Sequence, residues 1–235
     1  MEKEYHDKEY CIEVRGDFAC FTRPEMKVER VSYDVITPSA ARNIYQAICW
    51  KKDAMEWEIT RIEVLNPILK MLIKRNEVVA TMSYSSSAKE NNPEINVEDK
   101  RTQKSSYILR DVAYRIFAKL KFIPLRDRPK EWEYKTHNPK VENPKKYQEM
   151  FERRARSGQC FNQPYLGCRE FSCSFEYIEN ATYGRGGAGS KDLGYMLYDM
   201  DFKSNIDNPQ AMFFHARMID GVIEVPSPGS EEIRR

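Results

Sequence analysis

The chain has 235 residues and a mass of 27.7 kDa, with 41% hydrophobic, 12% aromatic and 31% charged residues. A chain of this size and composition can bury a large core without disulfides, which excludes an intrinsically disordered protein. It contains no apolar run of about 18 residues, and its charged first ten residues lack the apolar segment of a signal peptide. We therefore expect a cytoplasmic protein that contacts no membrane and whose six cysteines are mostly buried, reduced thiols.

The net charge of +2 is spread unevenly along the chain. Residues 192–235 contain four basic and eight acidic residues, whereas the first 191 residues carry a net charge of +6. This asymmetry predicts an anionic partner for the basic part of the chain.

The first predicted elements are a strand, a helix and a second strand. Alternating apolar residues predict a strand over residues 10–15. Thr37 and Pro38 are typical of a helix N-cap and first position, and the helix should end near Trp50. Residues 57–65 are rich in β-forming side chains and predict a strand that stops at Asn66-Pro67. The apolar face expected of the helix consists of Ala40, Ala41, Ile44, Ala47 and Ile48.

Residues 68–106 interrupt this pattern. A short strand can be placed within residues 69–80, and the polar residues 83–104 predict an exposed, mobile loop. Alternation over residues 112–122 then predicts a long strand with one basic face, formed by Arg115, Lys119 and Lys121.

The second half begins with a charged loop over residues 126–143. Asn143-Pro144 predicts the start of a second helix, and Ser157-Gly158 predicts its end. Further strands are expected over residues 169–177 and 193–202, followed by a hairpin over 212–225 around Asp220-Gly221.

This order predicts an α+β protein. Strand, helix, strand, strand, helix, strand is the order of a ferredoxin-like (RRM-like) βαββαβ domain. We expect that domain over residues 1–178, with an insertion at about 68–106, and a small antiparallel β-rich region over 179–235.

Several motifs bear on the chemistry. Residues 184–191 are glycine-rich but lack the lysine placement of a Walker A loop, so a flexible loop is the preferred interpretation, with a backbone contact to a phosphate as the alternative. The cysteines and histidines lack zinc-finger spacing, and no metal site is predicted. No run matches the aromatic RNP pattern, which disfavours the type of binding module that uses that pattern.

Several longer runs, in order along about three quarters of the chain, are distinctive. Together they resemble the subtype-d member of the fifth Cas family, the Dvulg subtype of type I-C CRISPR systems, within the RAMP superfamily. The runs are Gly16–Lys27, Val31–Ala40, Arg61–Ile68, Lys74–Val78, Arg153–Phe161 and Pro164–Phe171.

The resemblance implies an endoribonuclease that cleaves the repeats of CRISPR precursor RNA without a metal ion or another cofactor. It further implies that the protein stays on the 5′ handle of the crRNA as a subunit of Cascade. Its partners would then be the repeat RNA, the backbone and large subunits of type I-C Cascade, and target DNA within that complex.

In metal-free RNA cleavage the 2′-OH of the substrate attacks, and the protein supplies a base, an acid and cations. The family is associated with a tyrosine at the end of the first helix and a Lys-His pair at the start of the second. Cys49 stands at the tyrosine position, and Lys145 and Lys146 stand at the pair, so only Lys145 carries over unchanged. Lys145 is expected to stabilise the phosphorane, and Lys146 is a candidate for acid or base work.

Two further residues are alternatives for the missing groups. Tyr45 lies one helical turn before Cys49 and can replace the phenol, although a buried position on the apolar face is the preferred interpretation. His137, in the loop before the second helix, is a candidate acid or base, although a merely exposed histidine is the preferred interpretation.

RNA binding is predicted for clusters of basic residues near aromatic ones. The predicted RNA-binding residues are Arg23, Lys27, Arg30, Arg42, Lys51, Arg153, Arg154 and Arg156. Because two of the three catalytic positions differ, a non-catalytic crRNA-binding and assembly subunit stays open as the alternative function.

Overall fold

A long twisted sheet organises the molecule. The computed structural model describes residues 7–80, 96–129, 142–202, 204–205 and 207–235. The central strands follow the order β6-β1-β5-β3-β9, and each neighbouring pair is antiparallel. The chain is therefore an α+β protein dominated by antiparallel pairing, as predicted. The strands of this path are β1 (Lys8–Ala19), β3 (Met55–Val64), β5 (Arg101–Phe122), β6 (Ser174–Ile178) and β9 (Val222–Glu224).

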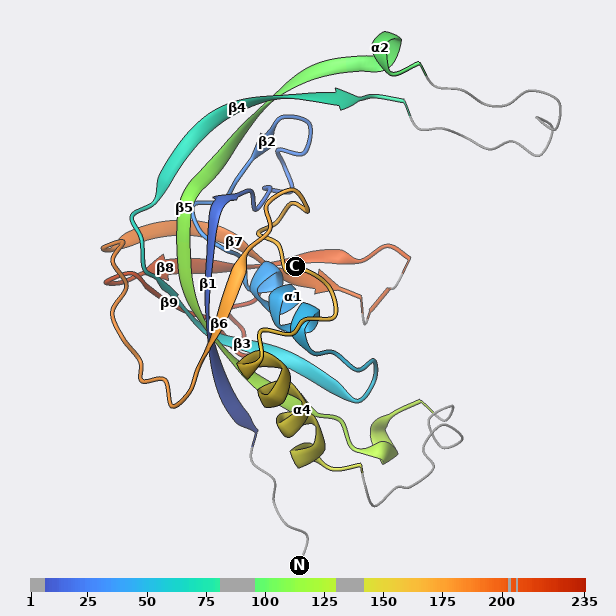
Figure 1. Cartoon of the computed structure of the whole chain (residues 1–235), viewed down its shortest axis with the longest axis vertical. Coiled ribbons are helices and arrows are strands. Elements are labelled where there is room, and N and C mark those ends of the chain that lie inside the picture. The colour runs from blue at the N-terminus through green and yellow to red at the C-terminus, as the bar shows by residue number, and fades with distance from the viewer. Residues whose placement is uncertain (1–6, 81–95, 130–141, 203, 206) are drawn as a thin grey trace, which may run out of the picture.

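The two long helices, α1 (Pro38–Ile48) and α4 (Pro144–Arg156), lie on one face of this sheet (Figure 1). Both predicted starts are confirmed, because the Thr37 side chain accepts a hydrogen bond from the Ala40 amide and the Asn143 side chain accepts one from the Lys146 amide. Beneath them, an aromatic cluster from both helices and two strands occupies the centre of the core. Its closest ring centroids are 4.6 Å apart for Tyr45 and Trp57, 4.7 Å for Trp57 and Phe151, and 4.8 Å for Tyr10 and Phe151.

The strand predicted within residues 69–80 is confirmed, but the loop predicted over residues 83–104 is wrong for its described part, residues 96–104. Both segments belong to a two-stranded arm. β4 (Leu69–Val78) pairs with the first half of β5, from Leu69 opposite Arg110 to Val78 opposite Arg101, and α2 (Val97–Lys100) precedes β5. The arm projects beyond the rest of the sheet (Figure 1). No side chain of β4 is fully buried, because five are half-buried and five are exposed, so its hydrophobic alternation in the sequence is weak. Residues 83–95 of the predicted loop lie outside the described residues.

The expected C-terminal hairpin has the predicted turn but different strand pairing. Asp220 and Gly221 have φ angles of 51° and 75°, and the Val222 amide donates to the Ile219 carbonyl at 2.9 Å. Beyond this turn the strands separate. β8 (Gln210–Met218) pairs with β7 (Lys191–Asp201) in a second sheet, whereas β9 pairs with β3 in the main sheet.

Three short elements complete the fold. β2 (Arg30–Val31) runs parallel to β5, and a 3-10 turn, η1 (Leu125–Asp127), follows β5. The strand predicted over residues 169–177 is confined to β6, because the preceding residues turn back on themselves through a bridge between Tyr165 and Ser172. Within the described parts of the chain, no helix is both long and apolar enough to cross a membrane.

The cysteines match the expectation of reduced thiols. All six are free of disulfides, and five of them are buried.

We expect Gly167→Ala to destabilise the protein far more than Gly189→Ala. Both glycines have positive φ angles, +84° and +73°, so alanine costs about 1–2 kcal/mol at either position. A Cβ at Gly167 would in addition meet the Cys20 carbonyl oxygen at 2.0 Å, whereas a Cβ at Gly189 meets nothing within 4 Å. Backbone displacement should therefore add about 1–3 kcal/mol at Gly167 alone.

Urea-induced unfolding of both variants and the wild type measures this difference. Equal losses of unfolding free energy would show that the contact between residues 167 and 20 is not as tight as described.

Candidate functional site

The carboxyl end of α1 is joined to the last turn of α4. A helix end leaves carbonyl groups without partners inside the helix. Here the Ala47 carbonyl accepts from the amides of Phe161 at 2.7 Å and Asn162 at 3.2 Å. The Ile48 carbonyl accepts from Nη1 of Arg154 at 3.1 Å. α1 has no basic residue in its own last turn, so the Arg154 guanidinium supplies the cation that its dipole favours there.

Cys49 follows α1 and is fully buried, with an exposed fraction of 0%. Burial raises the pKa of its thiol, which Arg154 and Lys51 lower only in part. Its carbonyl accepts from the indole Nε1 of Trp57 at 2.8 Å. The position at which the resemblance expects a tyrosine thus holds a neutral, inward-facing thiol. It offers no proton donor to a substrate at the surface.

Tyr45 is a core residue and not a substitute phenol. Its side chain is 0% exposed, and its hydroxyl lies 2.7 Å from the Ile116 carbonyl oxygen and 3.0 Å from that of Tyr10. Burial raises its pKa well above the usual range. The structure therefore agrees with the preferred interpretation, a buried position on the apolar face of the helix. The alternative, that Tyr45 replaces the missing phenol, is corrected, because a phenol enclosed by backbone carbonyls cannot reach a phosphate in solvent.

The Lys145-Lys146 pair occupies the first turn of α4 with two different environments. The Lys145 side chain is 70% exposed, and its ammonium lies 3.6 Å from Glu149. The Lys146 ammonium instead contacts Glu142. Of the two lysines, Lys145 is the one that an incoming phosphate can reach, at a helix end whose free amides also favour an anion.

Glu142 gathers three donors at this end of α4. Its carboxylate accepts from Nη1 of Arg128 at 2.8 Å and from the Tyr147 hydroxyl at 2.5 Å, besides Lys146. Burial alone would raise the pKa of this carboxyl, but these donors together lower it to about 2. Glu142 therefore stays ionised and holds Lys146 in place, a role that the sequence did not indicate.

The two groups of candidates lie at opposite ends of α4. Lys145 and Arg154 are nine residues apart, which is roughly 13 Å along a helix. The structure therefore brings Arg154 to Cys49 but leaves Lys145 and Lys146 away from both. His137 and the rest of its loop lie outside the described residues.

Some of the predicted RNA-binding residues form an ion pair with an acidic side chain, and others do not. Lys27, Lys51 and Arg153 are exposed and have no acidic partner among the residues that the structure describes. Arg154 has no acidic partner in the described part of the chain either, but it donates to the Ile48 carbonyl. The remaining four are engaged: Arg23 with Glu25 and the Tyr33 ring, Arg30 with Glu77 and Cys168, Arg42 with Asp199, and Arg156 with Glu152 and Glu179.

The basic face predicted for residues 112–122 is partly neutralised. Arg115 lies 3.0 Å from Glu13 of β1, and Lys121 lies 2.6 Å from Asp7 and 3.3 Å from Glu58 of β3. Glu13 and Glu58 on the neighbouring strands, together with Asp7 just before β1, thus pair with these two cations. Two of the three cations predicted for this face are therefore already neutralised.

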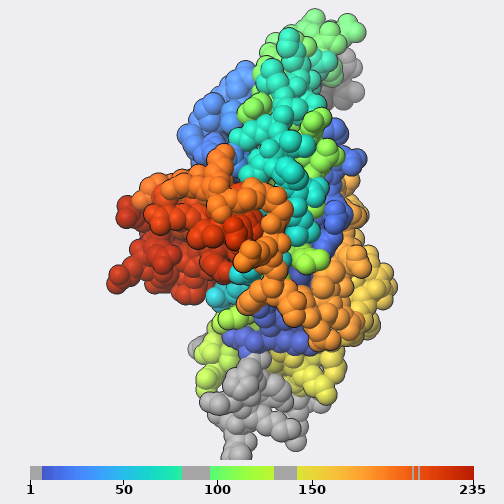
Figure 2. Space-filling model, turned by 90° about the vertical axis from the view of Figure 1, so that its left-hand side faces the viewer, coloured from blue at the N-terminus to red at the C-terminus, as the bar shows by residue number. Residues whose placement is uncertain are grey.

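The glycine-rich segment 184–191 packs against the sheet and is not a phosphate loop. The Gly186 amide donates to the Asp220 carbonyl and the Gly187 amide to the Val64 carbonyl, both at 2.8 Å. A Cβ at Gly186 would meet the Val64 oxygen at 2.3 Å, which explains the need for glycine. Figure 2 shows this segment (orange) at the surface, between the C-terminal strands (red) and the main sheet.

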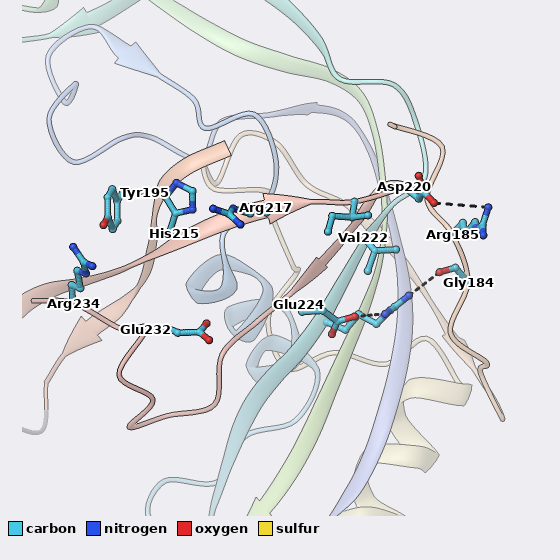
Figure 3. A pocket seen from close by; sticks show the side chains of 12 residues that line it. Gly184, Arg185, Tyr195, His215, Arg217, Asp220, Val222, Glu224, Glu232 and Arg234 are labelled. Atoms are coloured by element: carbon cyan, nitrogen blue, oxygen red, sulfur yellow. Dashed lines mark hydrogen bonds and ion pairs between the residues drawn. The ribbon is translucent and has the colours of Figure 1, made fainter. Parts of the chain in front are cut away.

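Two grooves flank the C-terminal sheet. One of about 800 Å³ is lined by Arg61, Tyr195, His215, Arg217 and Arg234, among others (Figure 3), and none of the predicted catalytic or RNA-binding residues lines it. The other, of about 600 Å³, lies between α1 and β7 and includes Arg42 and Trp50. Within the described parts of the chain, no three His, Cys, Asp or Glu side chains are grouped to hold a metal ion.

Comparisons with known proteins place the chain among CRISPR-associated proteins. A family model described as CRISPR-associated protein (Cas_Cas5) matches residues 9–226. A protein of Mannheimia succiniciproducens named CRISPR pre-crRNA endoribonuclease Cas5d is 43% identical over 236 residues, which cover 95% of this chain and 97% of the relative. A protein of the same name from Thermus thermophilus is 37% identical over 240 residues, covering 95% and 94%.

Solved structures share the fold. A crystal structure of a CRISPR-associated protein has a TM-score of 0.65 at 21% identity and covers 98% of both chains. A functionally uncharacterized protein from Streptococcus mutans has a TM-score of 0.63 at 21% identity, covering 98% of this chain and 99% of its own.

Glu142→Gln should lower the free energy of unfolding by about 3 kcal/mol at neutral pH, because it removes a carboxylate from a buried ion pair. The folded-state pKa of Glu142, about 2, lies below its ordinary value of 4.5. The charge-linked part of its stabilisation is thus complete above pH 4.5 and is lost as the pH falls towards 2. The difference in unfolding free energy between wild type and variant should therefore become smaller as the pH falls from 4.5 towards 2. Urea-induced unfolding at several pH values measures this difference.

The matched control is Glu149→Gln, whose carboxylate is 65% exposed and should show a small, pH-independent effect. If the loss of unfolding free energy in Glu142→Gln is the same at all pH values between 4.5 and 2, the conclusion that Glu142 stays ionised in the folded protein is contradicted.

Proposed function

Because the chain belongs to the Cas5d family of CRISPR-associated proteins, we propose that it is a pre-crRNA endoribonuclease. The observation that carries this proposal is the similarity to two proteins of that name, at 43% and 37% identity along almost the whole chain. The exposed cations at the two ends of α4 support an RNA substrate, since phosphates need cations that solvent leaves accessible.

The proposed reaction is metal-independent attack by the 2′-oxygen on the adjacent phosphorus. The 2′-OH loses its proton, the bond from phosphorus to the 5′-oxygen breaks, and that oxygen gains a proton. Lys145 stabilises the negative charge of the phosphorane, which its exposure and the free amides of the first turn of α4 support. Lys146 and His137 are the proposed groups for proton transfer, and Glu142 orients Lys146.

We further propose that the unit β1-α1-β3-β5-α4-β6 is a ferredoxin-like domain spanning residues 1–178. The strand order β6-β1-β5-β3 and the position of both helices on one face support it. Residues 179–235 form the proposed C-terminal β-rich region. Its strand β9 nevertheless completes the main sheet, which ties the two units together.

From the resemblance to the family we also propose that the protein stays bound to the 5′ handle of the crRNA within type I-C Cascade. Its partners there are the backbone and large subunits, and target DNA bound by the complex. A non-catalytic crRNA-binding subunit is the second candidate function. Two observations favour this second candidate: Cys49 is buried, and the Lys146 ammonium is in an ion pair with Glu142. Two of the three family positions therefore lack a free acid or base.

The purified protein should cleave the repeat RNA of its own host in excess EDTA. A repeat RNA with a single 2′-deoxy nucleotide at the cut should bind but stay intact, because it lacks the attacking hydroxyl. Gel analysis of end-labelled RNA measures both. Tight binding without cleavage of the unmodified repeat would contradict the enzyme and support the non-catalytic subunit.

Lys145→Ala should lower the single-turnover cleavage rate at least about 100-fold while weakening RNA binding about threefold or less. The ammonium acts mainly on charge that develops in the transition state. Lys119→Ala is the matched control. Lys119 lies on β5 and not on α4, so its loss should leave the cleavage rate unchanged. An unaffected rate in Lys145→Ala would remove this residue from the mechanism.

A further inference from the structure

Phe161 is the most exposed large hydrophobic side chain among the described residues, with an exposed fraction of 80%. An aromatic ring held in water loses the hydrophobic stabilisation that burial would give it. A single such residue is unremarkable on its own, so its setting decides whether it has a purpose.

The backbone that carries Phe161 is fixed on both sides. Gly158, with a φ angle of 63°, ends α4, and the Phe161 and Asn162 amides both donate to the Ala47 carbonyl. Two residues further on, the Gln163 side chain donates to the Cys173 carbonyl at 2.9 Å, and Pro164 is buried. The ring is therefore held in solvent by an anchored segment next to the end of α1.

Cations and a second aromatic ring surround the same helix end. Residues 49–53 and 153–162 contain five basic residues and one acidic residue. Of these, Lys51, Lys52 and Arg153 are exposed and pair with no acidic group in the described parts of the chain. Trp50, directly after Cys49, is 50% exposed.

An exposed aromatic ring next to unpaired cations matches a single-stranded nucleic acid. Stacking needs a base whose face is free, which a base inside an RNA duplex lacks, and the flanking phosphates need the cations. An apolar protein surface would satisfy the ring but would leave three cations to be desolvated without partners. The charge therefore favours RNA over a protein as the occupant.

We propose that Phe161 stacks on an unpaired base of the repeat RNA, with Trp50 as a second apolar surface and Lys51 and Arg153 on the flanking phosphates. This inference rests on the proposed function and adds to it a residue that positions the RNA at the carboxyl end of α1. It also gives that end of α4 a role in binding that is distinct from the role of Lys145 at the other end.

The test compares Phe161→Ala with Phe161→Tyr, which keeps a stacking ring, and with Arg153→Gln, which removes a charge. Dissociation constants for host repeat RNA are measured by fluorescence anisotropy at several salt concentrations. Phe161→Ala should bind about tenfold more weakly, equivalent to ~1.4 kcal/mol, with an unchanged salt slope, and Phe161→Tyr should bind like the wild type. Arg153→Gln should reduce the salt slope by about 0.7, as expected for one lost phosphate contact.

The control is Tyr195→Ala, an exposed ring on the C-terminal sheet, which should bind like the wild type. If the wild type binds and Phe161→Ala binds equally well, the stacking inference is overturned while the proposed function stands; the ring then serves another partner. If Phe161→Ala lowers the salt slope as Arg153→Gln does, the ring acts through the charges and the inference also fails. If the wild type itself does not bind repeat RNA, the proposed function fails.

Discussion

Backbone pairing along β5 is the constraint on which the rest of the structure depends. This 22-residue strand pairs with β1, β3 and β4 in antiparallel fashion and with β2 in parallel. Every amide and carbonyl along a buried strand needs a partner, so its length fixes where the neighbouring strands begin and end. One half of β5 lies in the core and the other half forms part of the arm. A single uninterrupted strand therefore connects the core to the arm.

The same requirement for paired backbone groups builds the proposed binding surface. The carbonyls at the end of α1 need donors, and α4 and the segment after it supply them through Arg154 and Phe161. These contacts place the end of one helix against the end of the other. The exposed cations and rings around this junction are consequences of a hydrogen-bond requirement inside the fold.

Electrostatics then separates cations that support the fold from cations that are available to a ligand. Lys146 and Arg128 form ion pairs with Glu142 inside the protein, whereas Lys145 and Arg153 are exposed to solvent. A cation held by a carboxylate costs more to bring to a phosphate, because that ion pair must first be broken. The helix α4 thus carries solvent-exposed cations near both of its ends.

Some features follow from the sequence alone because they depend on neighbouring residues. The starts of both helices after Thr37 and Asn143, and the turn at Asp220-Gly221, reflect local hydrogen bonds and dihedral preferences, and the distinctive runs identify the family. The tertiary structure decided what distant residues do to one another: which sheet β9 joins, that β4 and the first half of β5 form an arm, that two backbone carbonyls enclose the Tyr45 hydroxyl, and that amides of the glycine-rich segment bond within the fold. Local chemistry sets how a segment starts and turns, but pairing and burial depend on partners far away in the chain, and no short pattern records them.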